Sequence, residues 1–259
     1  MMQKRACQCQ VDTIFYLSTV THLVVLPSLA MQKSNNLSNN ELDRLGQDIV
    51  NHTSTTTTTT QRTRTPPGNS TNNKDANISK LLKALNFDPN TKPGAKWGNL
   101  DPLFRHPTTG ACVYCGNTNA AQSKAMLLAV NITRVVNCKD PDAPNYHEQD
   151  PNFQYLRFPI AYHYRDLPRE KRGVQATLKY FGKLHNWVDA QLADNKSVLI
   201  HCLAGAHRAG TASISYVMHA GKLSKTEAIA ICQRQRPVIN PIGSFPELLE
   251  KLNVALKER

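Results

Sequence analysis

Short apolar runs alternate with stretches of helical periodicity from about residue 111 to the end of the chain. The clearest run is Ser197–Ile200, whose unbroken apolar character is typical of a strand buried on both faces. We expect two more strands, at Arg134–Cys138 and Tyr155–Pro159. We expect helices over residues 120–130, 174–192, 209–220, 225–235 and 245–256. This alternation predicts an α/β fold in which helices flank a central, mostly parallel sheet.

The composition divides the 259-residue chain near residue 95. Residues 1–94 contain asparagine clusters and the threonine run Thr55–Thr60. We expect this low-complexity region to be largely disordered, because its apolar surface is too small to offset the entropy of folding. Residues 95–259 form the expected globular domain. Within the first region, Ile78–Leu85 has apolar residues at helical spacing, and two readings stay open: a helix that docks on the domain or on a partner, and a transient helix.

Residues 1–30 have some features of a targeting signal. Lys4 and Arg5 precede the partly apolar stretch Val11–Ala30, in which polar residues interrupt the apolar ones. No run in the sequence approaches the roughly 20 apolar residues needed to cross a bilayer. We therefore expect an intracellular protein, cytoplasmic or nuclear, without a membrane span. Secretion or organelle import directed by residues 1–30 is the alternative.

The segment after Ile200 is the expected site, because ligands bind beyond the carboxyl ends of the strands in open α/β sheets. It reads His201-Cys202-Leu203-Ala204-Gly205-Ala206-His207-Arg208. A loop that wraps from a strand into a helix points successive backbone N–H groups at one centre, and the helix dipole adds positive potential there. Arg208 can hold two phosphate oxygens in its planar fork, and Cys202 at the base of the loop can act as a thiolate nucleophile.

This loop resembles the Cys-x5-Arg signature of the cysteine-dependent protein tyrosine phosphatases, specifically their small dual-specificity group. Residues 114–137 resemble the opening strand–helix–strand of that family, and residues 223–229, 236–237 and 240–245 resemble its closing helices and their connection. The resemblance covers roughly residues 110–256, which is the whole of the globular part.

The resemblance implies that Cys202 attacks phosphorus to form a cysteinyl-phosphate, which water then hydrolyses. It implies that Arg208 clamps the phosphate and that His201 orients the loop. No metal or other cofactor is implied. The resemblance further implies that the loop backbone binds the phosphate, through residues Leu203, Ala204, Gly205, Ala206 and His207.

Ala209 departs from the family pattern, which usually has Ser or Thr directly after the arginine. That hydroxyl helps the cysteine sulfur to leave when the phosphoenzyme is hydrolysed. We therefore expect slow turnover and accumulation of the cysteinyl-phosphate, unless Thr211 or a water molecule replaces the missing hydroxyl.

The general acid is the second departure. The family takes it from an aspartate about 30 residues before the cysteine, and Tyr162 stands where that aspartate often falls. Asp166 is the aspartate of the 162–173 loop and our preferred acid. Glu170 and His163 are alternatives. A further reading leaves Asp166 outside catalysis, paired at the surface with a neighbouring arginine.

Cys138 ends a strand that should neighbour the catalytic strand, and it resembles the resolving cysteine of some relatives. A reversible Cys138–Cys202 disulfide and a packed core thiol are both open readings.

The formal net charge of +12 suits the attraction of phosphate dianions. We expect phosphorylated proteins as substrates, on phosphotyrosine and also on phosphoserine or phosphothreonine. Two alternatives stay open: a non-protein substrate (phosphoinositide, phosphoglycan or RNA 5′-phosphate) and a low-turnover phosphoprotein-binding module. Nucleic-acid binding is not expected, because no basic motif is interleaved with aromatic residues. The catalytic domain is expected to be monomeric.

Overall fold

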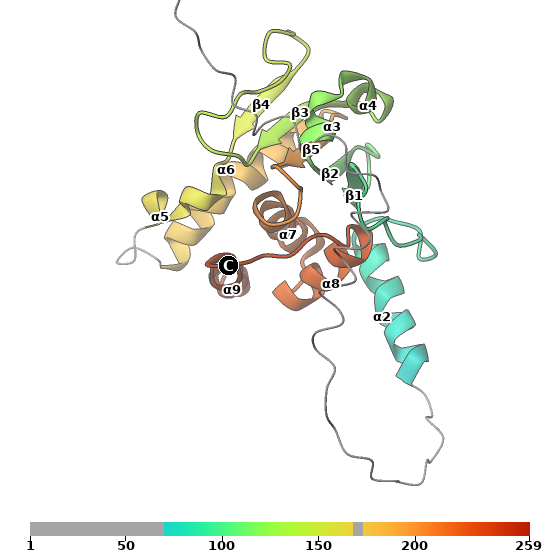
Figure 1. The fold of residues 1–259 in the computed structure, drawn as a ribbon. Helices are drawn as coiled ribbons and strands as arrows, with labels where there is room; N and C mark the ends of the chain where they lie inside the picture. The colour runs from blue at the N-terminus through green and yellow to red at the C-terminus, as the bar shows by residue number, and fades with distance from the viewer. Residues whose placement is uncertain (1–69, 168–172) are drawn as a thin grey trace, which may run out of the picture. The chain divides into compact units, whose positions relative to one another are not determined.

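A computed structural model describes residues 70–167 and 173–259. The targeting-like residues 1–30 and the run Thr55–Thr60 lie outside the described residues. Five strands form one sheet in the order β1-β2-β5-β3-β4 (Figure 1). Their bounds are Leu100–Arg105, Cys112–Gly116, Ile132–Asn137, Gln154–Arg157 and Ser197–His201 for β1 to β5.

The sheet is mostly parallel, which confirms the predicted fold class. β5 pairs in parallel with β2 on one side and with β3 on the other, and β3 pairs in parallel with β4. β1 is an antiparallel edge strand beside β2. Its Pro102 has no N–H to donate, which is tolerated at an edge, and periodicity alone does not identify such a strand.

The central strand β5 is buried on both faces, as its apolar run predicts. Val198 and Ile200 enter the larger core, whereas Leu199 enters a smaller core on the opposite face. Helices cover both faces (Figure 1). The larger core contains residues of α2, α6, α7, α8 and α9 (Ser70–Ala84, Val174–Ala193, Arg208–Gly221, Lys225–Gln235 and Phe245–Lys257).

The smaller core lies beneath α3 and α4, which are Thr118–Gln122 and Lys124–Ala129. The sequence predicts one helix over residues 120–130, and this prediction is wrong in one respect. Ser123 ends α3 and caps α4, since its side chain accepts a hydrogen bond from the Met126 amide. A short 3-10 turn, Ile160–Tyr162, and the one-turn helix α5, His163–Asp166, follow β4.

The folded domain begins well before residue 95. Leu81, Leu82 and Leu85, in and just after α2, are buried in the larger core. Further along, the Gly94 amide donates to the Arg234 carbonyl at 3.1 Å. The expected boundary between residues 94 and 95 therefore falls inside the ordered part, and of the two readings of Ile78–Leu85 the structure shows the docked helix. Among the helices of the described residues, none is long and apolar enough to span a membrane.

Candidate active site

The predicted signature loop lies at the carboxyl end of the central strand. Cys202 directly follows β5 and is 3% exposed, and Arg208 is the first residue of α7. Gly205 makes the turn between them with a φ of +67°. A Cβ atom at this position would lie 2.5 Å from the Gly116 carbonyl oxygen, so a side chain would clash with the backbone of β2.

Every backbone carbonyl from His201 to His207 accepts a hydrogen bond from outside the turn. The donors, in chain order of these carbonyls, are the Cys138 amide (2.9 Å), the Thr118 hydroxyl (3.1 Å), the Thr118 amide (2.9 Å), Arg236 Nη2 (3.0 Å), Arg236 Nε (3.0 Å), the Asn240 amide (3.2 Å) and Thr211 Oγ1 (2.7 Å). These bonds hold the loop carbonyls away from its centre.

The backbone amides of the same loop are left available. Within the described part of the chain, none of the amides of residues 203–208 donates a hydrogen bond to protein. Because the carbonyls are held by outside donors, the amides can turn toward one centre beside Cys202, at the N-terminus of α7. That arrangement favours a tetrahedral oxyanion such as phosphate.

Arg236 braces this loop from below. Its side chain is 1% exposed, and besides the two loop carbonyls it bonds the Gly98 carbonyl at 2.7 Å and Asp101 Oδ2 at 2.6 Å. Burial raises the pKa of Asp101, and the Arg236 guanidinium opposes that shift. Sequence reasoning assigned no role to Arg236, since the sequence does not show that the side chain is buried.

Arg208 points toward a carboxylate that sequence reasoning also missed. Its Nη1 lies 3.3 Å from Asp140 Oδ1, and the same oxygen accepts a hydrogen bond from the Tyr162 hydroxyl at 3.3 Å. Asp140 lies three residues beyond the end of β3, which neighbours β5. The rule that ligands bind at the carboxyl ends of strands would have singled it out.

The structure brings Asp166 to a different partner. Its Oδ2 lies 3.2 Å from Lys183 Nζ of α6, and both side chains are more than half exposed. His163 is buried, with Nδ1 3.1 Å from the Ile160 carbonyl. Glu170 lies outside the described residues. Asp140 and Tyr162 are thus the acidic and phenolic groups that the described structure joins to the arginine.

Two side chains next to the nucleophile are buried and neutral. Burial lowers the pKa of His201 to about 4, so its ring carries no charge at neutral pH. Cys138 follows the end of β3, and its amide bonds the His201 carbonyl. Burial and the neighbouring Cys202 raise the pKa of the Cys138 thiol well above its ordinary value. The uncharged His201 ring is fully buried, directly before Cys202 in the chain.

At the start of α7, the two side chains nearest in sequence to Ala209 that could replace the missing hydroxyl are His207 and Thr211. Ala209 is fully buried. The Thr211 hydroxyl donates to the His207 carbonyl at 2.7 Å, so its hydrogen is already engaged. His207 Nδ1 lies 2.5 Å from the Asn240 carbonyl, which only accepts, so this nitrogen carries a proton. Neither side chain offers a free donor to the sulfur in this arrangement.

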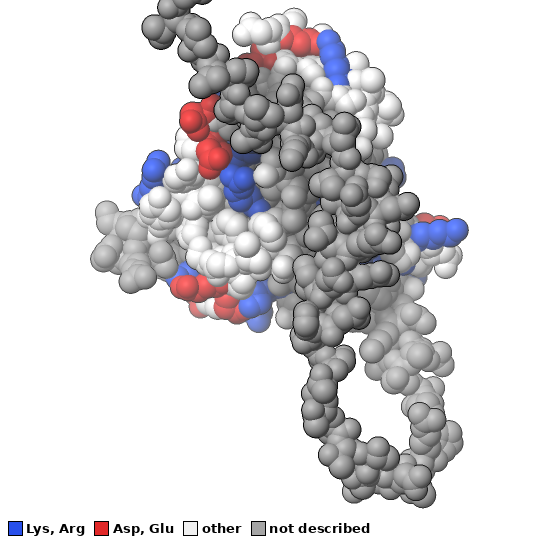
Figure 2. Space-filling model, viewed as in Figure 1, with Lys and Arg blue, Asp and Glu red and all other residues white. Residues whose placement is uncertain are grey.

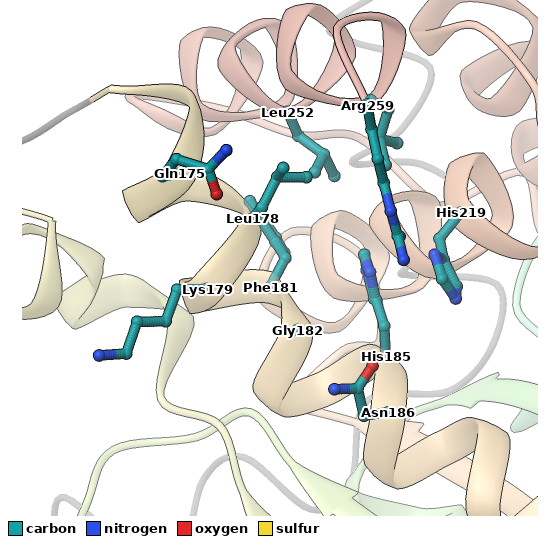
Figure 3. A pocket seen from close by; sticks show the side chains of 11 residues that line it. Gln175, Leu178, Lys179, Phe181, Gly182, His185, Asn186, His219, Leu252 and Arg259 are labelled. Carbon is teal, nitrogen blue, oxygen red and sulfur yellow. The ribbon is translucent and has the colours of Figure 1, made fainter.

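A separate cavity of about 320 Å³ lies between α6, α7 and α9 (Figure 3). His185 and His219 stack at its base with ring centroids 4.6 Å apart, and Arg259 lies beside them. Asp189 accepts hydrogen bonds from His219 and Tyr216. The cavity is lined by none of the residues 201–208, so it is separate from the loop that holds Cys202 and Arg208.

Known proteins share this domain. Human dual specificity protein phosphatase 9 is 28% identical over 149 residues, which are 57% of this chain and 36% of that protein. Human dual specificity protein phosphatase 14 is 28% identical over 139 residues, 53% of this chain and 64% of that protein. The chain thus spans between about a third and two thirds of the length of these relatives.

Solved structures are similar as well. The crystal structure of human DUSP28 is 21% identical, with a TM-score of 0.48 over 64% of this chain and 99% of that one. The family model described as the catalytic domain of dual specificity phosphatases matches residues 113–253, more than half of the chain. That range includes the loop at Cys202 and Arg208. The chain therefore belongs to the dual specificity phosphatase catalytic domain family.

Proposed function

We propose that this protein is a protein phosphatase that hydrolyses phosphotyrosine, and also phosphoserine and phosphothreonine, through a cysteinyl-phosphate. The observation that carries this proposal is the loop of residues 201–208, in which outside donors hold seven consecutive carbonyls while the amides stay available. An anion bound there would lie in the loop that begins at Cys202, directly after β5. Family membership supports the same reaction.

In the proposed mechanism the loop amides and Arg208 bind the three non-bridging phosphate oxygens. The Cys202 thiolate attacks phosphorus as the bond to the leaving oxygen breaks, and a protein acid gives that oxygen a proton. Water then attacks the cysteinyl-phosphate, and the thiolate leaves. The amides and the guanidinium are already in position, so they stabilise the transition-state charge without reorganising.

The first test is hydrolysis of p-nitrophenyl phosphate and of a phosphotyrosine peptide. Cys202→Ser should abolish both reactions, because a serine hydroxyl at neutral pH is a far weaker nucleophile than a thiolate. Cys112→Ser is the matched control, since Cys112 is also buried but lies at the opposite end of β2. Activity that survives in Cys202→Ser would refute the proposal.

Asp166 is the acid that the sequence favours, and it has its own test. If it protonates the leaving group, Asp166→Asn should lower kcat by about 100-fold or more with little change in substrate binding. An unchanged kcat would remove it from the mechanism. Its ion pair with Lys183, at 3.2 Å, makes Lys183→Gln a useful companion variant.

The substrate class needs a direct comparison. On the described surface that Figure 2 leaves in view, basic and acidic side chains lie among uncharged ones. Phosphopeptides, phosphoinositides and phosphoglycans should be presented to the Cys202→Ser variant, which binds without turning over. Retention of phosphoinositides but not of phosphopeptides would favour the alternative substrate.

A reducing compartment suits this chemistry. The five described cysteines, including Cys202, are all free, and thiols persist in the cytosol and nucleus rather than in oxidising compartments. We therefore propose that the enzyme acts inside the cell. Microscopy of the full chain, compared with a variant that starts at Met31, tests this placement and the alternative that residues 1–30 direct import.

A further inference from the structure

Asp140 is the carboxylate that contacts Arg208 in the described structure. Resting on the phosphatase function proposed above, we propose that Asp140, rather than Asp166, protonates the leaving group. Asp140 belongs to the loop after β3, and Asn137 at the end of that strand pairs with His201 of β5. The sheet thus brings Asp140 to the same edge as Cys202, although 61 residues separate them in the sequence.

The contact with Arg208 sets the distance to a bound phosphate. Asp140 Oδ1 lies 3.3 Å from Arg208 Nη1, and the Asp140 side chain is half exposed. A phosphate gripped by the same guanidinium would sit at hydrogen-bond distance from it, about 2.7–2.9 Å. Carboxyl and phosphate would then be neighbours around one cation, with the carboxyl on the solvent side where the leaving group departs.

Tyr162 accounts for a general acid at a different sequence position from the one the family uses. It stands where the family often has aspartate, and its hydroxyl donates to Asp140 Oδ1 at 3.3 Å. The Asp140 charge raises the pKa of Tyr162, so the phenol keeps its proton and stays a donor. The Arg165 guanidinium lies 4.5 Å from the centre of the Tyr162 ring, which fixes the ring further.

Substrate binding changes the charge balance at this carboxyl. Arg208 is the cationic partner of Asp140. A bound phosphate dianion would share that cation and bring its negative charge beside the carboxyl. The described ionic partner of Asp166 is Lys183 instead.

The proposed steps balance. In the first, a P–S bond forms and the P–O bond to the leaving group breaks; the electron pair goes to that oxygen, which takes the Asp140 proton. This leaves cysteinyl-phosphate, a free alcohol or phenol and the Asp140 carboxylate. In the second step, the oxygen of a water molecule attacks phosphorus while the Asp140 carboxylate takes a proton from that water. The P–S bond breaks, which releases the thiolate and monohydrogen phosphate.

Leaving-group dependence tests this role. Asp140→Asn keeps the shape of the side chain and its acceptor for Tyr162 but cannot give a proton. We expect kcat/KM, which reports the step in which the leaving group departs, to fall by about 100-fold or more on phenyl phosphate and by less than about 10-fold on p-nitrophenyl phosphate, because nitrophenolate leaves without protonation. Asp142→Asn is the matched control in the same loop, and Asp166→Asn is measured beside it.

Each outcome separates this inference from the function on which it rests. Equal losses of kcat/KM on both substrates would reduce Asp140 to a residue that positions Arg208 and would overturn the assignment. A leaving-group signature in Asp166→Asn would also overturn it, while the phosphatase function would stand. A wild-type chain inactive on every aryl phosphate would refute both.

Discussion

At the residue scale, Arg236 links the candidate site to the core. It donates to the Ala204 and Gly205 carbonyls and pairs with the largely buried Asp101. Arg236→Lys keeps the charge but cannot reach all of these acceptors with one planar fork. We expect the free energy of unfolding to fall by about 3–5 kcal/mol, since a buried charge and several carbonyls lose their partners, and we expect activity on p-nitrophenyl phosphate to fall with it.

Urea unfolding and steady-state kinetics check this prediction. Arg234→Lys is the control, because Arg234 lies in α8, two residues before Arg236, and bonds the Thr91 carbonyl at 2.6 Å, away from the loop. If Arg236→Lys kept wild-type stability and kcat, the hydrogen bonds from Arg236 to the Ala204 and Gly205 carbonyls would not be needed to hold the 201–208 loop in shape.

Ala209 carries the second prediction at this scale. The Thr211 hydroxyl is engaged by the His207 carbonyl, so we expect it not to assist the departing sulfur. Wild-type enzyme should therefore show a burst of p-nitrophenol followed by a slower steady state. Ala209→Ser should raise the steady-state rate by about 10-fold, which one new hydrogen bond of ~1.4 kcal/mol in the transition state would give, and should shrink the burst.

Rapid-mixing measurements with both enzymes test this. Ala212→Ser is the control for a hydroxyl buried elsewhere in α7, because Ala212 is also fully buried. The absence of a burst in the wild type would mean that phosphoenzyme hydrolysis is not the slow step.

At the scale of elements, α2 contributes to the domain through a short leucine cluster. Leu82 has no exposed surface, so Leu82→Ala should cost about 2–5 kcal/mol. For a domain of this size we expect the Tm to fall by about 10 °C. Lys83→Ala, one residue further and exposed, should leave the Tm nearly unchanged. Equal Tm values for the two variants would show that α2 does not stabilise the domain in solution.

The neighbouring strands β3 and β5 place two thiols at one edge of the sheet. Cys138 directly follows β3 and Cys202 follows β5, and we expect mild peroxide to join them in a disulfide that dithiothreitol reverses. Peptide mapping would detect it. Because burial holds the Cys138 thiol protonated, the reaction should be slow. After peroxide treatment, dithiothreitol should restore the activity of the wild type but not that of Cys138→Ser. If peptide mapping finds no Cys138–Cys202 crosslink in the peroxide-treated wild type, the proposal is wrong.

At the scale of the whole molecule, buried histidines make stability depend on pH. Burial lowers the pKa of His185 to about 3 and that of His201 to about 4, against an ordinary value of 6.5. Below pH 6.5 these two histidines therefore bind protons in the unfolded chain but stay neutral in the folded chain, so the free energy of unfolding falls as the pH falls. The two together should cost about 4 kcal/mol between pH 7 and pH 5.

Urea unfolding across this pH range measures the effect. His185→Gln should remove about half of the pH dependence, whereas His106→Gln, at a partly exposed position, should leave it unchanged. A pH profile that is the same in His185→Gln as in the wild type would contradict the prediction.

The parts of the fold that sequence predicted well are those set by local pattern. The bounds of α8 are the predicted ones, and those of α6, α7, α9 and β5 differ from prediction by one residue at most at either end. The sequence did not predict β1, because a proline interrupts the strand pattern. It did not predict the break between α3 and α4 either, because only the capping hydrogen bond of Ser123 shows that a new helix begins there. The docking of α2 stayed open because a short helix is marginal until tertiary contacts bury it.

The sequence by itself determined the strand, turn and helix around Cys202 and Arg208. All of this lies within about a dozen consecutive residues, where apolar pattern, a glycine turn and chemically specific side chains act locally. Only the tertiary structure decided which distant groups serve that loop. Arg236 and Asp140 reach it from 34 residues after and 62 residues before Cys202. Their roles follow from burial and from the parallel order of the strands, which no local pattern encodes.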